Sequence, residues 1–107
     1  MCGIVGQVSK SNVSHHRLDR MNTLISHRGP DDSGIWLNND QTIGLGHRRL
    51  SIIDLSTDGH QPMHALNRFV LVFNGEIYNY KELKNQLLDK WSFSSKTDTE
   101  VIIAAYA

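Results

Sequence analysis

The sequence has few of the features that would indicate a membrane protein, a nucleic-acid-binding protein or a disulfide framework. No apolar run approaches the roughly 18 residues that cross a bilayer, and no signal peptide opens the chain. The 11 Lys and Arg residues balance the 11 Asp and Glu residues, so no surplus positive charge attracts nucleic acid or an anionic membrane. The single cysteine in 107 residues allows no internal disulfide. These absences predict a cytoplasmic protein with neither nucleic-acid nor membrane partners.

Residue spacing also argues against metal and dinucleotide sites. Six histidines are present, but His60 and His64 flank Pro62, and the lone cysteine completes no zinc motif. Gly44 and Gly46 lack the third glycine and the following helix that a dinucleotide-binding turn needs. We therefore expect no metal and no cofactor in this segment.

Hydrophobic patterns predict four strands and three helices, with the polar run at 38–40 as a hairpin turn. Sequence-adjacent strands with flanking helices predict a layered α/β domain with mainly antiparallel sheets. Asn79 with Glu82, and Thr97 with Glu100, each fit a capping box that opens a helix. Strands are expected at 3–8, 35–37, 42–48 and 69–73, and the last of these should be covered on both faces. A helix is expected at 15–26, with Ser14 as its N-cap. A further apolar segment lies at 50–55.

The only cysteine, Cys2, stands directly after the initiator methionine. Chain ends are poorly ordered unless they are tied down, so this is an unusual place for a core residue. A buried, inert thiol is nevertheless the common alternative for a lone cysteine. If Met1 is removed, the thiol and a free α-amine belong to the same residue. Because an α-amine is partly neutral at pH 7, it can take the thiol proton, which predicts a nucleophile with its own base.

Three further stretches carry candidate binding groups. Asn74 and Gly75 follow an apolar strand and form either a tight turn or a pair of donors for an oxyanion. Arg48 and Arg49 must face opposite sides of a strand, so one can turn inward toward a substrate carboxylate or a structural ion-pair partner. Asp98, near a helix start, is either a cap or a partner for a substrate ammonium.

Five motifs follow one another along the chain: CGIVG from Cys2, HRGPD from His27, RLSIID from Arg49, NGEIYN from Asn74 and TDTE from Thr97. In this order and spacing they closely resemble the glutaminase domain of glutamine-hydrolysing asparagine synthetases. Each motif alone is weak evidence, but five in register over the whole chain are specific. Other N-terminal-nucleophile amidotransferases share the opening and have a different arginine motif.

The resemblance implies a role for each site residue. Cys2 is the nucleophile that attacks the side-chain amide of glutamine, and its α-amine acts as base and then as acid. Asn74 and Gly75 form the oxyanion hole and complete the catalytic set. The substrate-binding residues are Arg49 for the α-carboxylate, Asp98 with Glu76 for the α-ammonium, and Ile52 and Ile53 through their backbone groups.

The resemblance also implies a fold and a larger protein. The fold is the αββα sandwich of N-terminal-nucleophile hydrolases with antiparallel sheets, here truncated: residues 1–107 are the N-terminal part of a type-2 glutamine amidotransferase domain. The rest of that domain, and a synthetase domain that uses ATP, Mg²⁺ and aspartate as acceptor, belong to missing sequence in a homodimeric parent. Two alternatives stay open: a related amidotransferase with another acceptor, such as a surface-polysaccharide sugar, and an inactive glutamine-binding or regulatory module.

Overall fold

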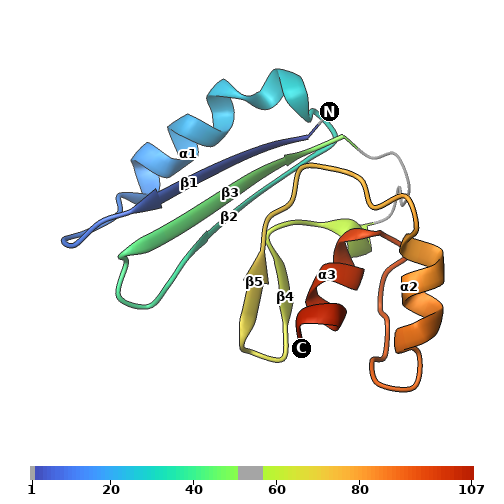
Figure 1. Cartoon of the computed structure of the whole chain (residues 1–107). Coiled ribbons are helices and arrows are strands. Elements are labelled where there is room, and N and C mark those ends of the chain that lie inside the picture. The colour runs from blue at the N-terminus through green and yellow to red at the C-terminus, as the bar shows by residue number, and fades with distance from the viewer. Residues whose placement is uncertain (1, 51–56) are drawn as a thin grey trace.

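The computed structural model describes residues 2–50 and 57–107, which form two antiparallel sheets flanked by helices (Figure 1). The elements are, in chain order, β1 (Gly3–Val8), α1 (His15–Leu24), η1 (Ser26–Arg28), β2 (Asp32–Leu37), β3 (Ile43–Arg49), η2 (Thr57–Gly59), β4 (Met63–Ala65), β5 (Phe69–Leu71), α2 (Tyr80–Leu87) and α3 (Thr99–Tyr106). The first sheet has the strand order β1-β3-β2, and the second consists of β4 and β5.

Helix α1 forms where the sequence predicts it, because a cap opens it and an apolar face covers the first sheet. The Ser14 hydroxyl accepts a hydrogen bond from the Arg17 N–H at 3.2 Å and so caps the helix. Leu18 is fully buried against the sheet, where its side chain and that of Val13 both lie over Gly44 of β3. The helix ends at Leu24, two residues before the predicted end, and the chain continues into η1.

The layers run helix, sheet, sheet, helix, which confirms the predicted fold class. Figure 1 shows α1 over one face of the first sheet and the β4–β5 sheet on the other side of it, with α3 beyond. The rings of Trp36 in β2 and His64 in β4 lie 6.5 Å apart, so the two sheets face one another. The ring centroids of Phe69 in β5 and Tyr106 in α3 lie 5.7 Å apart. Helix α2 packs on α3.

Strand β1 has the predicted boundaries, and β2 and β3 form the predicted hairpin, with β2 starting earlier, at Asp32. The strand expected at 69–73 is shorter than predicted and ends at Leu71. Its residues are half-buried rather than covered on both faces. Strand β4 was not predicted; it has only three residues and directly follows Pro62. The apolar piece expected at 50–55 lies almost entirely outside the described residues.

Neither predicted capping box forms. Asn79 occupies the N-cap position of α2, but its side chain makes no capping hydrogen bond. Helix α3 has Asp98, not Thr97, at its N-cap position, and again no side-chain cap. The Glu100 carboxylate turns instead to the preceding loop, where it accepts hydrogen bonds from Trp91, Ser94 and Ser95. Competition from these donors explains why the capping box of Thr97 and Glu100 is absent.

Replacing Leu18 tests the packing of α1 on the first sheet. Leu18→Ala removes a fully buried side chain, so we expect the free energy of unfolding to fall by about 2–5 kcal/mol. The matched control is Leu24→Ala in the same helix, whose side chain is 75% exposed and whose loss should cost within about 0.5 kcal/mol. Urea unfolding measures both; equal losses in the two variants would contradict this packing.

Candidate active site

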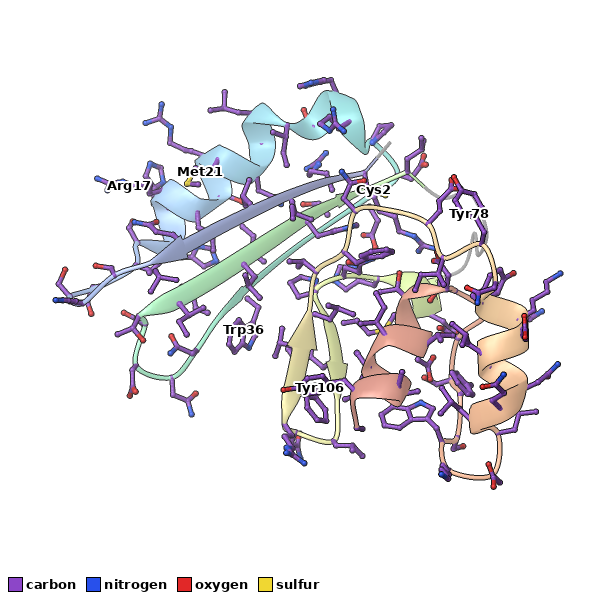
Figure 2. All side chains as sticks on the ribbon, viewed as in Figure 1. Cys2, Arg17, Met21, Trp36, Tyr78 and Tyr106 are labelled. Carbon is purple, nitrogen blue, oxygen red and sulfur yellow. The ribbon has the colours of Figure 1, made fainter. Side chains whose placement is uncertain are left out.

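The N-terminal thiol lies beside the end of β3. The antiparallel register pairs Gly3 with Arg48, and one more step of that register sets Cys2 opposite Arg49. The Cys2 Sγ accepts a hydrogen bond from the Leu50 N–H at 3.3 Å and lies 3.7 Å from the Leu50 carbonyl oxygen. Cys2 is half-buried, at the end of the sheet where β1 begins (Figure 2). Strand pairing therefore ties down the terminal thiol.

The two adjacent arginines face opposite sides of the first sheet, as strand alternation requires. Arg49 is 6% exposed and lies on the face opposite α1, where its guanidinium reaches Gly59. The half-buried Arg48 lies on the α1 side, where its Nε donates to the Gly29 carbonyl oxygen at 3.2 Å. The inward arginine is thus Arg49. Since a Cβ on Gly3 would meet Ile25 on the α1 side, alternation puts Cys2 on the same face as Arg49.

Two glycines let other segments approach Arg49 closely. A Cβ on Gly29 would collide with the backbone of Arg48 and Arg49, and the Asp31 N–H donates to the Arg49 carbonyl oxygen at 3.0 Å. A Cβ on Gly59 would lie 2.8 Å from the Arg49 Cζ and 2.8 Å from the Thr97 Cγ2. The Arg49 guanidinium and Thr97 therefore share the space above Gly59.

The segment that carries Asn74 and Gly75 is held at both ends. The Phe73 carbonyl oxygen lies 3.1 Å from the His47 Nε2, and the Ile77 N–H donates to the Asp98 Oδ2 at 2.8 Å. Residues 74–76 between these two anchors are exposed. The tight-turn alternative for Asn74 and Gly75 does not take the form of a hairpin, because the element after Gly75 is α2 and not a returning strand.

Asp98 is 6% exposed at the start of α3. Its carboxylate does not cap the helix and instead accepts the Ile77 N–H. It follows Thr97, which lies beside the Arg49 guanidinium. The cationic and anionic candidates for a zwitterionic ligand are thus brought to neighbouring positions.

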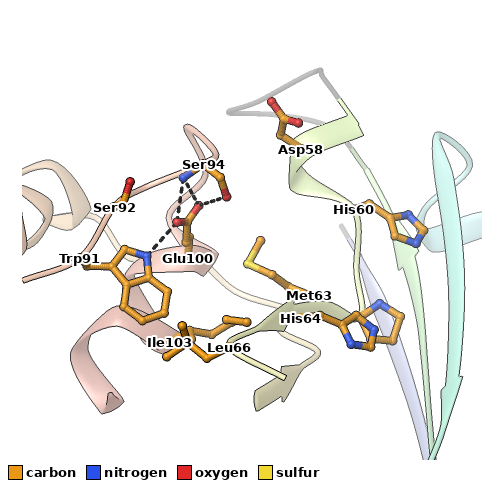
Figure 3. Close-up of a pocket in the computed structure, with 12 residues that line it drawn as sticks. Asp58, His60, Met63, His64, Leu66, Trp91, Ser92, Ser94, Glu100 and Ile103 are labelled. Carbon is orange, nitrogen blue, oxygen red and sulfur yellow. Dashed lines mark hydrogen bonds between the residues drawn. The ribbon is translucent and has the colours of Figure 1, made fainter. Parts of the chain in front are cut away.

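A second buried carboxylate, Glu100, braces the loop before Asp98. It accepts from the Trp91 Nε1–H at 2.9 Å and the Ser94 N–H at 3.0 Å (Figure 3). It also accepts from the Ser95 N–H at 2.7 Å. Burial by itself would raise the pKa of Glu100, but the hydrogen bonds from Trp91, Ser94 and Ser95 outweigh it and lower the pKa below its usual value. Glu100 therefore stays ionised within this loop.

Glu100 and Trp91 also line a cavity of about 360 Å³ between β4, the 91–94 loop and α3 (Figure 3). Among the described residues, its lining does not include Cys2, Arg49 or Asp98. Its one buried carboxylate, that of Glu100, is satisfied by groups of its own chain. The cavity is thus separate from the candidate site.

The described contacts bring most of the predicted residues to one end of the two sheets, but not all of them together. Cys2 contacts Leu50, Arg49 lies beside Thr97, and Asp98 contacts Ile77.

The other predicted site residues are not hydrogen-bonded to these within the described part of the chain. In particular, no hydrogen bond among the described residues joins Cys2 to Asn74 or Gly75. Glu76 is exposed in the 74–76 segment, and Ile52 and Ile53 lie outside the described residues.

Three residues of the site were not predicted from the sequence: His47, Gln61 and Gly59. His47 lies two positions before Arg49, and strand alternation alone would have put both on one face. Gln61 is buried and accepts the Phe73 N–H at 2.7 Å. Neither Gln61 nor Gly59 carries a sequence signal, because their contacts depend on how the second sheet packs on the first.

The described ranges, 2–50 and 57–107, hold neither a candidate metal site nor a helix that could cross a membrane. Within them, no three or more His, Cys, Asp or Glu side chains are grouped so that they could hold a metal ion. Likewise, none of their helices has the length and apolarity that a bilayer crossing requires.

Comparison with known proteins gives a family match over the whole chain. The family model described as a glutamine amidotransferase domain matches residues 1–107. The chain is 40% identical over 112 residues to asparagine synthetase (glutamine-hydrolysing) 1 of Bacillus subtilis, an alignment that covers 99% of this chain and 17% of that protein.

Two further relatives broaden the comparison. A Methanocaldococcus jannaschii protein, whose name also contains the words asparagine synthetase and glutamine-hydrolysing, is 44% identical over 99% of this chain and 24% of its own length. Amidase chry2 of Gibberella zeae is 49% identical over 78% of this chain and 12% of its own. The chain therefore spans no more than about a quarter of these curated relatives.

Lowering the pH should test the role of Glu100. Because the pKa of Glu100 is lowered by folding, its contribution to stability is complete above about pH 4.5, the ordinary value, and is lost as the pH falls through the folded-state pKa. Below pH 4.5 we expect the unfolding free energy of the wild type to fall more steeply than that of Glu100→Gln. At pH 7 the same variant should lose about 1–3 kcal/mol.

Chemical unfolding over this pH range measures both effects. The matched control is Glu82→Gln, which alters an exposed carboxylate in the first turn of α2 and should follow the wild-type pH dependence. Parallel curves for the wild type and Glu100→Gln would contradict the bracing role.

Proposed function

The chain belongs to the glutamine amidotransferase domain family, and from this premise we propose that it hydrolyses glutamine to glutamate and ammonia through a thioester on Cys2. The observation that carries the proposal is the position of Cys2 and Arg49. They lie opposite one another at the same end of β1 and β3, on the face that meets the second sheet. A nucleophile and an anion-binding group are then a short distance apart, which suits a small amino-acid substrate.

In the proposed reaction, Cys2 supplies both the nucleophile and the proton carrier once Met1 is removed. The α-amine of Cys2 takes the thiol proton, and the sulfur attacks the carbonyl carbon of the glutamine side-chain amide. The tetrahedral intermediate collapses as the carbon–nitrogen bond breaks, and the protonated α-amine gives its proton to the departing ammonia. Water then hydrolyses the glutamyl thioester to glutamate and restores the thiol.

The oxyanion of the tetrahedral intermediate needs preorganised donors. We assign these to the Asn74 side-chain amide and the Gly75 N–H, which lie in an exposed segment anchored at Phe73 and Ile77. Glutamate would be a poor substrate, because it would present a carboxylate where these donors expect a neutral amide.

Substrate binding in this proposal uses the two charges of the amino acid. The buried Arg49 guanidinium holds the α-carboxylate, an arrangement that allows paired hydrogen bonds. The Asp98 carboxylate, with Glu76, holds the α-ammonium; Ile77 donates to one oxygen of Asp98, and the other is assigned to the substrate. Backbone groups of Ile52 and Ile53 are assigned to positioning the substrate. Asparagine, one methylene shorter, would not reach the thiol from the same anchors.

For the whole protein we propose that the ammonia is passed to aspartate. The names of the asparagine synthetase relatives support this acceptor, as does their length beyond the region they share with this chain. ATP and Mg²⁺ would then be used by a synthetase domain outside residues 1–107, and we expect the parent to be a cytoplasmic homodimer. Residues 1–107 would supply only the ammonia, as the N-terminal part of the glutaminase domain.

A second candidate is an amidotransferase with a different acceptor. It is favoured by the amidases of Gibberella zeae and Penicillium rubens, which are 49% and 45% identical to this chain over 78% and 85% of it. Because the glutaminase step is the same in both candidates, the acceptor does not alter the roles given to Cys2, Arg49 and Asp98.

Substitution of the thiol tests the proposal. In the full-length protein, Cys2→Ala should reduce glutamine-dependent product formation by at least about 10³-fold, because the nucleophile is lost. Activity with added ammonium salt should remain, since free ammonia bypasses the thioester. Assays of glutamate release and of amidated product measure the two activities. Survival of both would disprove the nucleophile assignment; a wild-type protein that binds glutamine without releasing ammonia would indicate the inactive binding module.

A further inference from the structure

The peptide group of Phe73 is held on both sides by buried side chains that the proposed mechanism does not use. Its carbonyl oxygen lies 3.1 Å from the His47 Nε2, and its N–H donates to the Gln61 Oε1 at 2.7 Å. His47 is 1% exposed and Gln61 is 6% exposed. Phe73 lies two residues beyond the end of β5, so no strand ladder takes these backbone groups. The two side chains satisfy polar groups that would otherwise be costly to bury.

His47 must act as a hydrogen-bond donor here, because its partner is a carbonyl oxygen. The proton is therefore on Nε2. The other ring nitrogen, Nδ1, is buried and has no hydrogen-bond partner among the described residues. Burial, the largest cause, lowers the pKa of His47. The imidazole is thus a neutral donor that points from β3 across to the Phe73 carbonyl.

Gln61 connects the same peptide to α3. Its Oε1 accepts from Phe73, while its Nε2 donates to the Thr99 Oγ1 at 3.4 Å. Thr99 is the first residue of α3 and directly follows Asp98, which accepts the Ile77 N–H. Residues 73–77 are therefore fixed at one end by His47 and Gln61 and at the other by Asp98.

We infer that His47 and Gln61 are positioning residues for the oxyanion hole: by holding both polar groups of the Phe73 peptide, they aim the Asn74 amide and the Gly75 N–H at the reacting carbonyl. The inference rests on the proposed glutaminase function. Asn74 and Gly75 have no strand pairing of their own and are exposed, so their orientation depends on the peptide before them. An error of about 1 Å at such donors can cost on the order of 10²-fold in rate.

The primary test is a pair of substitutions in the full-length protein. His47→Leu removes the donor, and we expect kcat for glutamine hydrolysis to fall by about 10- to 100-fold. KM for glutamine should stay within about twofold, because Arg49 and Asp98 still hold the substrate. His47→Gln keeps a neutral N–H donor and should recover most of the rate. His16→Leu, an exposed histidine on α1, is the matched control and should leave both parameters unchanged.

A double-mutant cycle separates positioning from general damage to the fold. In an Asn74→Ala background the side-chain donor is already absent, so His47→Leu should cost much less than in the wild type. If His47→Leu does not fold, Gln61→Met serves as the second variant. We expect it to lower kcat as His47→Leu would, and to cost much less in the Asn74→Ala background.

The outcomes distinguish this inference from the proposed function itself. Absence of glutamine hydrolysis in the wild-type protein would overturn both. If the wild type is active, two results would overturn only the positioning role. One is an unchanged kcat in His47→Leu; the other is an equal rate loss from His47→Leu in the wild-type and Asn74→Ala backgrounds. A His47→Gln variant as slow as His47→Leu would also overturn it, because a donor would be present without effect.

Discussion

The antiparallel pairing of β1 with β3 is the constraint on which the site depends. A thiol at the second residue of a chain would ordinarily be in a frayed end. Pairing of Gly3 with Arg48 removes that freedom, sets Cys2 opposite Arg49 and lets the Leu50 N–H donate to the sulfur. The same register fixes which arginine turns inward. Without it, neither the proposed nucleophile, Cys2, nor the proposed anion-binding group, Arg49, would have a defined place.

The η2 turn before the second sheet and the start of α3 complete the candidate site. Gly59 allows Thr97 to share the space around the Arg49 guanidinium, and Asp98 holds the Ile77 N–H. Glu100 in turn fixes the loop that leads to Asp98. Buried polar groups need partners, so each of these bonds also specifies where a loop must run. The result is a candidate site made from five segments of the chain, at Cys2, 47–50, 59–61, 73–77 and 97–100.

Much of this arrangement could be predicted from the sequence, because its signals are local. Small and β-branched residues, followed by the polar stretch at 9–14, predicted the boundaries of β1. The Ser14 cap predicted the start of α1, and strand alternation at the adjacent arginines predicted that one of them could turn inward. The failures were non-local. Strand β5 stops at Leu71, opposite the first residue of β4, and side chains of His47 and Gln61 then bond the Phe73 peptide. The Glu100 side chain leaves its expected cap for the Trp91 loop. No pattern in a single sequence reports such competition between segments.

The most direct measurement of the central claim is covalent labelling of the mature full-length protein with a diazoketone analogue of glutamine, followed by peptide mapping. The account predicts one adduct on the Cys2 sulfur, suppressed by glutamine but not by asparagine, and absent after Arg49→Leu. An adduct on any other residue, or labelling of Cys2 that glutamine leaves unchanged, would contradict it.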